Sequence, residues 1–342
     1  MEINTGIKYF LTGATGYIGD ALCRRLLNDG NEVVALYRTE IPLFQHENLH
    51  WVKGHLEDPD SLFRAMEGCT HVFHCAGLAR QWHPDKNAFY KINVAGTENV
   101  LQAAATHKIE GLVFTSSAGV IGKSMGVPMT EDDARLEPFD NDYDLTKHLA
   151  EEKVRQFARN HQAVIVNPSG VFGPGLPSPS NPISKTLKNY IENPFYFVPG
   201  NGESIRNFVF IDDVVNGHLL AMEKGSSGER YIIGGENISF NELFGHFEKL
   251  TGLKRIRVTV PEGIFKVISP LVLGISKLMN KEPFITPAWA RRLFHPRLLS
   301  SQKAIDELGY AFTPVKEGLI KTLDSMGYER KKRVQRSVEF LS

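Results

Sequence analysis

The chain has 342 residues, of which 42% are hydrophobic and 23% are charged. This is the profile of a globular protein with one large domain and a smaller lobe. Lysine plus arginine equals aspartate plus glutamate at 39 each. Such a balance argues against nucleic acid as a partner, because no net positive field attracts it. Three scattered cysteines do not form a disulfide framework, so the expected location is the reducing cytoplasm.

No targeting or membrane-spanning segment is expected. The N-terminal residues 1–8 do not combine a basic segment with an apolar run. The most apolar stretch, residues 264–279, is interrupted by Lys266, Pro270 and Lys277, and its runs are shorter than the roughly 18 residues that a span needs. Two interpretations remain open for it. It lies on a membrane surface or lines an apolar substrate tunnel, or it is a helix buried against the smaller lobe.

The first half of the chain predicts an α/β fold with a doubly wound parallel Rossmann sheet. Short runs rich in β-branched residues alternate there with helical patterns, which is typical of a parallel sheet covered on both faces. Asp58 and Pro59 give one of the helices a clear start, as N-cap and first helical residue. The predicted strands span residues 8–11, 32–37, 50–53, 71–75, 111–116 and 163–167.

The pattern changes beyond residue 173. Residues 173–182 are rich in proline, serine and glycine and predict an irregular loop. Short strands at 207–211, 231–233 and 255–260 then mix with helices, one of them near 240–250. We therefore divide the chain into three parts. These are a Rossmann domain (1–173), a smaller C-terminal mixed α/β substrate lobe interleaved with the last Rossmann elements (174–330), and a basic tail (331–342).

A glycine-rich turn follows the first predicted strand. Residues 12–19 read TGATGYIG and lead into a helix over 20–28. Glycines allow the backbone to approach a pyrophosphate closely, and the helix N-terminus offers it free N–H groups and a positive dipole end. The strand before and the helix after make this more than a chance glycine pattern. The predicted cofactor contacts here are Gly13, Thr15, Gly16, Tyr17, Ile18 and Gly19.

The end of the second strand bears on the choice of cofactor. An acidic residue there binds the ribose hydroxyls of NAD, but this chain has Tyr37 and Arg38 instead. A guanidinium at this position can pair with the 2′-phosphate of NADP. The alternative is an ordinary solvated surface arginine. We therefore favour NADP over NAD.

Tyr143 and Lys147 are the predicted catalytic acid/base and its supporting cation. They lie four residues apart at the start of a predicted helix, and so share one helical face. A phenol ordinarily has a pKa near 10, and a nearby ammonium lowers it towards the working range. Lys147 also reaches the nicotinamide ribose in this interpretation. The competing interpretation is an exposed helical pair.

A hydroxyl at the end of the fifth strand would complete the site. Thr115, Ser116 and Ser117 follow one another there, and strand alternation separates Ser116 from the other two. We favour Ser117, which lies nearest the carboxyl end of the strand, as the group that polarises a substrate carbonyl.

Together these residues resemble the extended short-chain dehydrogenase/reductase family, also called the NAD-dependent epimerase/dehydratase family. The resemblance runs over nearly the whole chain and supports Ser117 over Ser116. Its motifs are TGxxGxxG at 12–19, a serine strand end at 117–122, NVxGT at 93–97, YxxxK at 143–147, NP and the following segment at 167–175, and RxFxxxxD at 206–213.

The resemblance implies further cofactor contacts from Leu56, Ala76, Gly77 and Pro168, besides Tyr143 and Lys147. It makes Arg206 a weak candidate for holding a substrate phosphate, with a structural salt bridge as the alternative. A homodimer is compatible with it. Two positions depart from the family pattern: His55 replaces an aspartate near the adenine, and Asn167 replaces an arginine common in sugar-nucleotide enzymes.

Within the family, the second half is most similar to the 3-beta-hydroxysteroid-dehydrogenase-like, dihydroflavonol-reductase-like and hopanoid-associated branches. This similarity implies an NAD(P)-dependent oxidoreductase that transfers hydride between nicotinamide and a ketone or hydroxyl of an apolar small molecule, steroid-, flavonoid- or alkanoate-like. One alternative is a nucleotide-sugar epimerase or dehydratase with transient internal redox. Another is an NADP(H)-sensing protein without chemistry, against which the intact Ser117, Tyr143 and Lys147 argue.

Two further patterns do not predict function. Residues 69–75 (CTHVFHC) contain cysteines and histidines, but on a strand their side chains alternate faces and cannot converge on one ion, so no metal site is expected. The basic run at 330–333 is expected to be a solvated terminal helix rather than a contact for lipid or nucleic acid.

Overall fold

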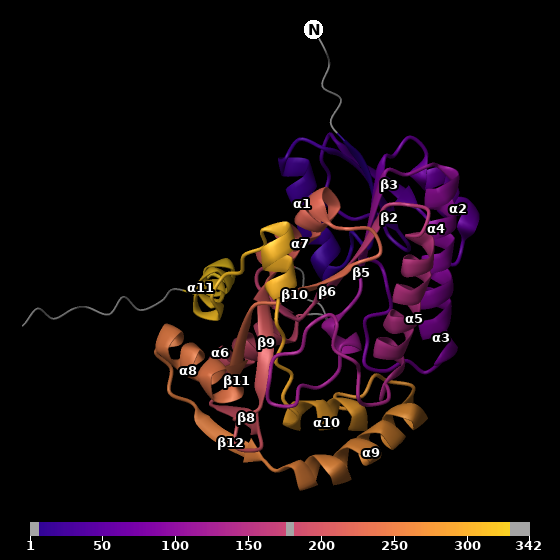
Figure 1. Cartoon of the computed structure of the whole chain (residues 1–342). Helices are drawn as coiled ribbons and strands as arrows, with labels where there is room; N and C mark the ends of the chain where they lie inside the picture. Colours follow the sequence, from indigo (N-terminus) through magenta and orange to yellow (C-terminus); the bar gives the residue numbers. More distant parts are fainter. Residues whose placement is uncertain (1–6, 176–180, 329–342) are drawn as a thin grey trace, which may run out of the picture.

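A computed structural model describes residues 7–175 and 181–328 and centres on a seven-stranded parallel sheet (Figure 1). The strand order is β10-β6-β5-β4-β1-β2-β3. It reverses between β1 and β4, as in Rossmann folds, so the predicted fold class is confirmed. The strands are β1 (Lys8–Thr12), β2 (Glu32–Tyr37), β3 (Leu49–Lys53), β4 (His71–His74), β5 (Gly111–Thr115), β6 (Ala163–Pro168) and β10 (Arg230–Ile233).

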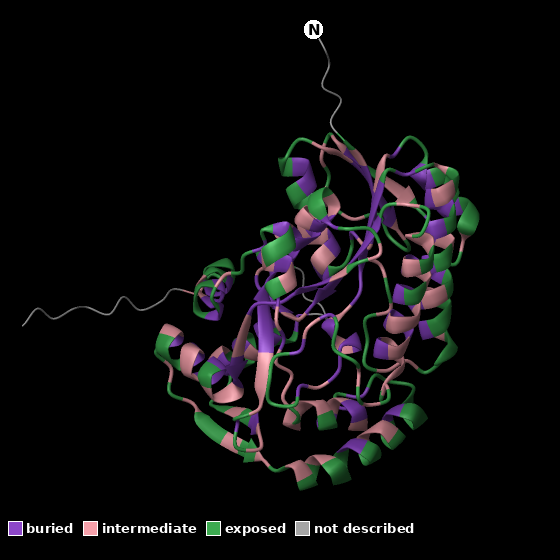
Figure 2. Ribbon diagram, in the orientation of Figure 1, coloured by how far each residue is buried: buried purple, intermediate pink, exposed green. Residues whose placement is uncertain are grey.

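Helices cover both faces of this sheet, whose strands are largely buried except for the edge strand β3 (Figure 2). They are α1 (Tyr17–Asn28) and α7 (Ile211–Lys224) on one face, and α2 (Pro59–Met66), α4 (Gly96–Thr106) and α5 (Asp142–Phe157) on the other. Successive side chains of a strand point to opposite faces of the sheet and so pack in two separate hydrophobic cores. Leu11 packs in the cluster that contains Leu22 of α1, while its neighbour Phe10 packs in the one that contains Leu62 and Val154. Burial of each such side chain contributes roughly 1.5–3 kcal/mol.

Local capping explains where two helices begin. Asp58 accepts a hydrogen bond from the Ser61 amide at 3.2 Å and Pro59 occupies the first helical position of α2, as predicted. Ser239 and Glu242 form a reciprocal capping box at the start of α8 (Phe240–Thr251). These contacts satisfy amide groups that the helix itself leaves unpaired.

The second half of the chain adds smaller mixed sheets. β7 (Gly170–Phe172), β9 (Ile205–Phe210) and β11 (Glu236–Ser239) form one, and β8 (Phe195–Pro199) pairs with β12 (Ile256–Val260) in another. β10 also comes from this half, but it pairs with β6 at the edge of the large sheet. The other helical elements of this half are α6 (Pro182–Glu192), α9 (Glu262–Met279), α10 (Pro287–Phe294), η3 (Ala304–Leu308) and α11 (Val315–Ser325). The basic run at 330–333 and residues 176–180 of the predicted loop lie outside the described residues.

Helix α9 turns its apolar side outwards. Ser269 and Ser276 are its buried residues, and seven of its apolar side chains have exposed fractions of 42% to 89%. These exposed side chains are Ile264, Val267, Ile268, Leu271, Ile275, Leu278 and Met279. The interpretation of this segment as a helix buried against the smaller lobe is therefore wrong for these residues. Within the described ranges, no helix is long and apolar enough to cross a membrane.

Close packing between strand, turn and helix depends on Gly19. A Cβ atom at this position would lie 2.0 Å from the Gly13 carbonyl oxygen, far inside van der Waals contact. We expect Gly19→Ala to lower the free energy of unfolding by about 3 kcal/mol. Gly245 in α8 is the matched control, because a Cβ there meets no atom within 4 Å. Gly245→Ala should stabilise the protein by about 1 kcal/mol. Urea denaturation measures both; equal stability of the two variants would contradict this packing.

Candidate active site

The glycine-rich turn forms a cradle of backbone amides at the start of α1. Gly13 has a φ of +81°, and a Cβ there would lie 2.6 Å from the Ala76 nitrogen. Gly16 is the N-cap of α1, and no side chain caps the helix. The amide groups of the first turn are thus left for an anion, and the missing side chains leave room for a pyrophosphate. The turn fits the phosphates of a nicotinamide dinucleotide.

Three more predicted cofactor contacts lie in this turn and at the start of α1, and Arg38 follows the neighbouring strand β2. Thr15 is exposed, whereas Tyr17 is buried and Ile18 packs against the core. The phenol of Tyr17 has a pKa raised by burial and then by Asp212. Arg38 is exposed directly after β2.

The remaining predicted contacts lie at or just after the ends of strands in the large sheet. They are Leu56 after β3, Ala76 and Gly77 after β4, and Pro168 at the end of β6. Leu56 is buried against Gly96, and Pro168 ends β6. Ala76 and Gly77 follow β4, and a Cβ on Gly77 would lie 3.5 Å from the Lys147 Nζ atom. The chain around Gly77 therefore runs next to Lys147, which joins the predicted cofactor contacts to the predicted catalytic residues.

A buried histidine that the sequence interpretation did not single out positions Ala76. His74 bridges the hydroxyls of Thr12 (2.7 Å) and Thr97 (3.0 Å). The Ala76 amide in turn donates to the Thr12 hydroxyl at 3.2 Å. Burial, and then the charge of Lys147, lower the pKa of His74 to about 3. The ring is therefore neutral at physiological pH, and its role is structural: its hydrogen bonds hold the Thr12 hydroxyl that accepts from Ala76.

Ser117 and Tyr143 face each other at the carboxyl end of β5. Asn141 caps α5 by accepting from the Asp144 amide at 2.8 Å, which fixes the first turn that carries Tyr143. Ser117 lies beyond β5; its hydroxyl accepts a hydrogen bond from the Gly119 amide at 3.0 Å and lies near enough to Tyr143 to lower the pKa of the phenol. Ser116 turns the other way and donates to Glu151 at 2.5 Å. Of the two serines, only Ser117 is placed to share a substrate oxygen with Tyr143.

The pKa of Tyr143 is raised to about 12, chiefly by burial and secondly by Asp144. The nearby Ser117 hydroxyl and the charge of Arg292 act in the lowering direction. The expectation that Lys147 lowers this pKa is wrong for the protein alone. The Lys147 ammonium donates to the Thr115 carbonyl oxygen at 2.6 Å, towards the strand and not towards the phenol.

Lys147 carries its charge inside the protein. Its side chain is buried, with the ammonium 4.3 Å from the centroid of the Phe114 ring. Burial lowers the pKa of Lys147 to about 8, against the raising effects of Cys75 and Glu151. This value keeps the ammonium largely charged at neutral pH and within reach of deprotonation slightly above it.

Glu151 and Asn167 tie the strand end to α5. The buried carboxylate of Glu151 accepts from the Asn167 amide at 2.7 Å, besides its bond from Ser116. The same amide group donates to the Ser117 carbonyl oxygen at 3.1 Å. Asn167, which replaces the arginine of sugar-nucleotide enzymes, thus serves as a structural link under Ser117.

Asn93 lies in a π-helical turn, η1 (Tyr90–Ala95), which leads into α4. Its side chain accepts from the Leu78 amide at 2.7 Å and donates to the Thr146 hydroxyl at 3.0 Å. These bonds join the loop after β4 to α5 in the turn between Tyr143 and Lys147.

The second half of the chain supplies a charged pair next to Tyr143. Arg292 of α10 bonds to Asp144 at 2.5 Å; the Asp144 side chain is buried and that of Arg292 is partly buried. Arg206, the weak candidate for a substrate contact, lies on β9 and is half-buried. No motif in the sequence indicated Arg292, because it follows Tyr143 by almost 150 residues and only the fold brings the two together.

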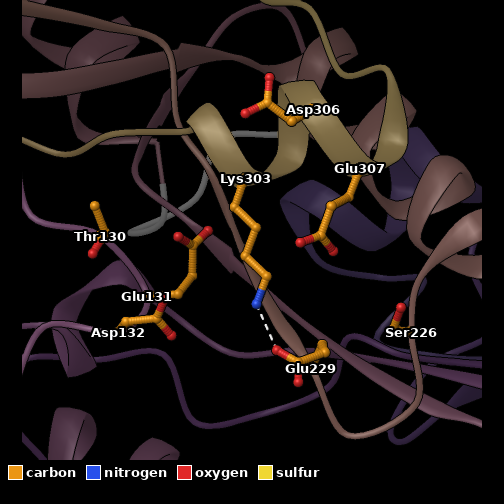
Figure 3. Close-up of a pocket in the computed structure, with 8 residues that line it drawn as sticks. All are labelled: Thr130, Glu131, Asp132, Ser226, Glu229, Lys303, Asp306 and Glu307. Atoms are coloured by element: carbon orange, nitrogen blue, oxygen red, sulfur yellow. Dashed lines mark hydrogen bonds and ion pairs between the residues drawn. The ribbon is translucent and has the colours of Figure 1, made fainter.

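The chain also has a hollow whose lining includes none of the predicted site residues (Figure 3). Carboxylates dominate this hollow, and the ammonium of Lys303 is bonded to Glu229 at 2.5 Å. Across residues 7–175 and 181–328, no group of three or more histidine, cysteine or acidic side chains is arranged to hold a metal ion. The residues that line the hollow are Thr130, Glu131, Asp132, Ser226, Glu229, Lys303, Asp306 and Glu307.

Comparison with known proteins identifies the family. The profile of the NAD dependent epimerase/dehydratase family matches residues 9–234, and the chain belongs to this family. It is 32% identical over 333 residues to a Synechocystis sp. protein named for dihydroflavonol 4-reductase, covering 93% of this chain and 95% of that one. It is also 28% identical to 2-alkyl-3-oxoalkanoate reductase of Stenotrophomonas maltophilia, covering 92% and 97%.

A solved structure has a similar fold. The crystal structure of gox2253 superposes with a TM-score of 0.76 at 30% identity, covering 96% of this chain and 100% of that chain. The shared family and the geometry of the site make the protein an NAD(P)-dependent oxidoreductase.

The buried charge of Lys147 predicts an unusual stability effect. Its pKa of about 8 in the folded protein lies below the ordinary 10.5. The unfolded chain therefore binds more protons between these values, and stability should rise with pH across that window. At pH 7 the full penalty is present, so we expect Lys147→Met to raise the free energy of unfolding by about 1 kcal/mol, after loss of the bond to Thr115.

Lys153 on the same helix provides the control, because its ammonium is paired with Glu98 at 2.7 Å on the surface. Lys153→Met should change stability by less than about 0.5 kcal/mol. Urea denaturation at pH 7 and pH 10 distinguishes the two variants. A Lys147→Met protein less stable than the parent at pH 7 would contradict the buried-charge penalty.

Proposed function

We propose that the protein is an NADP(H)-dependent oxidoreductase that exchanges hydride with a ketone or secondary hydroxyl on an apolar substrate. The observation that carries this proposal is that the Ser117 and Tyr143 hydroxyls lie close together, with the buried Lys147 one helical turn beyond Tyr143 on α5. This set lies next to the chain segment that holds the predicted cofactor contact Gly77. A protein that only sensed the cofactor would have no need of all three side chains.

In the direction of reduction, the Ser117 and Tyr143 hydroxyls donate hydrogen bonds to the substrate carbonyl oxygen. A nicotinamide dinucleotide held by the turn at residues 13–19 would supply hydride to the carbonyl carbon, and the π electrons of the C=O bond would move to the oxygen. Tyr143 gives its proton to that oxygen and becomes a phenolate, which solvent later reprotonates. The Tyr143 phenol keeps its proton at neutral pH, and the alkoxide that hydride addition produces is basic enough to take that proton.

Lys147 would hold the cofactor in this proposal. Its ammonium already has an acceptor in the Thr115 carbonyl oxygen, and it retains further N–H groups for a cofactor ribose hydroxyl. Oxidation of an alcohol is the reverse sequence, with Tyr143 as the base.

NADP is the proposed cofactor. The amide cradle at residues 13–19 would hold the pyrophosphate, and Leu56, Ala76 and Pro168 would border the rest of the dinucleotide. No carboxylate stands at the end of β2, where Arg38 is exposed and free to meet a 2′-phosphate. Relatives named for dihydroflavonol and oxoalkanoate chemistry support a substrate with an apolar body.

Replacement of Tyr143 by phenylalanine tests this proposal. Tyr143→Phe removes the proton donor and one carbonyl hydrogen bond, and we expect ketone-dependent NADPH oxidation to fall by about 10³-fold. Binding of NADPH, followed by its fluorescence, should change by less than about threefold. Tyr196→Phe, on β8, is the control and should keep full turnover. A fully active Tyr143→Phe enzyme would rule out this role for Tyr143.

A further inference from the structure

Four arginine side chains form a cluster that reaches Tyr143 through Arg292. Each is at least partly buried, and they come from separate segments of the chain. Two carboxylates accompany them, Asp144 and Glu137. The cluster therefore carries more positive than negative charge. The arginines are Arg135, Arg206 on β9, Arg292 on α10 and Arg297 shortly after α10.

Arg206 and Arg297 occupy paired positions on neighbouring extended segments. They form an isolated parallel β-bridge, and the Arg297 amide donates to the Ile205 carbonyl oxygen at 3.0 Å. Residues directly opposite in such a pair project their side chains from the same face. The backbone itself thus brings two guanidinium groups together, although like charges repel.

Most of these cations are neutralised within the protein. Arg292 is paired with Asp144 at 2.5 Å, and Arg135 donates to backbone carbonyl oxygens and lies 3.8 Å from Glu137. Arg297 shares the same Glu137 carboxylate at 3.8 Å, but its Nε atom is buried without a hydrogen-bond acceptor.

Arg206 differs from the other three. Among residues 7–175 and 181–328, no carboxylate or hydrogen-bond acceptor pairs with its guanidinium, and its nearest ring contact is Phe240, 6.0 Å from the guanidinium carbon to the ring centroid. Burial, and then the charges of Arg297 and Arg292, lower the pKa of Arg206 to about 9. A partly buried cation held beside two others is costly unless an anion balances it.

We propose that Arg206 and Arg297 bind a carboxylate of the substrate, so that the enzyme acts on apolar keto or hydroxy acids. This inference rests on the proposed function, since Arg292 connects the arginine cluster to Asp144 and Tyr143. A guanidinium matches a carboxylate with two parallel hydrogen bonds. One unpaired guanidinium, with one further free Nε donor, suits a single carboxylate on an otherwise apolar molecule.

Calorimetric titration of the NADP⁺-loaded protein tests this site without turnover. The probes are octanoate, its neutral methyl ester, and UDP as a diphosphate of the sugar-nucleotide type. We expect Arg206→Met to weaken octanoate binding at least tenfold and to leave the ester unchanged, and Arg206→Lys to restore part of the loss. Arg291→Met is the matched control on α10, because Arg291 is half exposed and lies 3.6 Å from Asp140.

Three results would overturn the proposal. They are equal octanoate binding by the parent and Arg206→Met, no octanoate binding by the parent, and UDP binding that is tighter than octanoate and depends on Arg206. Arg206→Met removes an unpaired charge and keeps an apolar side chain, so thermal unfolding should show an intact fold. An active Tyr143→Phe enzyme that still binds octanoate through Arg206 would contradict the proposed function and leave this site standing.

Discussion

The buried ammonium of Lys147 is the constraint on which the rest of the site depends. A charge enclosed by protein must find compensation within a few ångströms. Here the Thr115 carbonyl oxygen and the face of Phe114 provide it at the end of β5, and Glu151 adds its negative charge from α5. The same Glu151 carboxylate accepts a hydrogen bond from the Ser116 hydroxyl, which keeps the Ser116 side chain in the interior. The strand end therefore presents Ser117, and not Ser116, to Tyr143.

Residues from both halves of the chain affect the pKa of Tyr143. Burial on the Rossmann side raises the pKa of Tyr143, and the Asp144–Arg292 pair then adds two opposing charges beside it. Arg292 belongs to α10, which follows the apolar helix α9. Movement of α10 on substrate binding would consequently alter the electrostatics of a phenol in the other half. The contact of residues 264–279 with a membrane surface stays a prediction, now with an outward apolar face to support it.

Much of this arrangement could be predicted from local sequence, and the remainder depends on long-range packing. The parallel strands, the cap at Asp58 and the phosphate turn follow from nearest-neighbour chemistry, so the predicted strand limits differ from the observed ones by no more than two residues. The predicted strand 71–75, for example, ends one residue earlier, at His74. The direction of Lys147, the partner of Asp144 and the outward face of α9 could not be predicted, because each is decided by segments distant in sequence.

The central claim is that this site exchanges hydride with a separate substrate, which requires the cofactor to leave after each turnover. An enzyme that returns the hydride to the same substrate, as in internal redox, has no such need. The most direct measurement is the nucleotide released when freshly purified protein is denatured. A chain nearly free of nucleotide, which then binds NADPH more tightly than NADH, agrees with the proposed NADP(H)-dependent exchange at Tyr143 and with Arg38 at the 2′-phosphate. Close to one NAD per chain would contradict both.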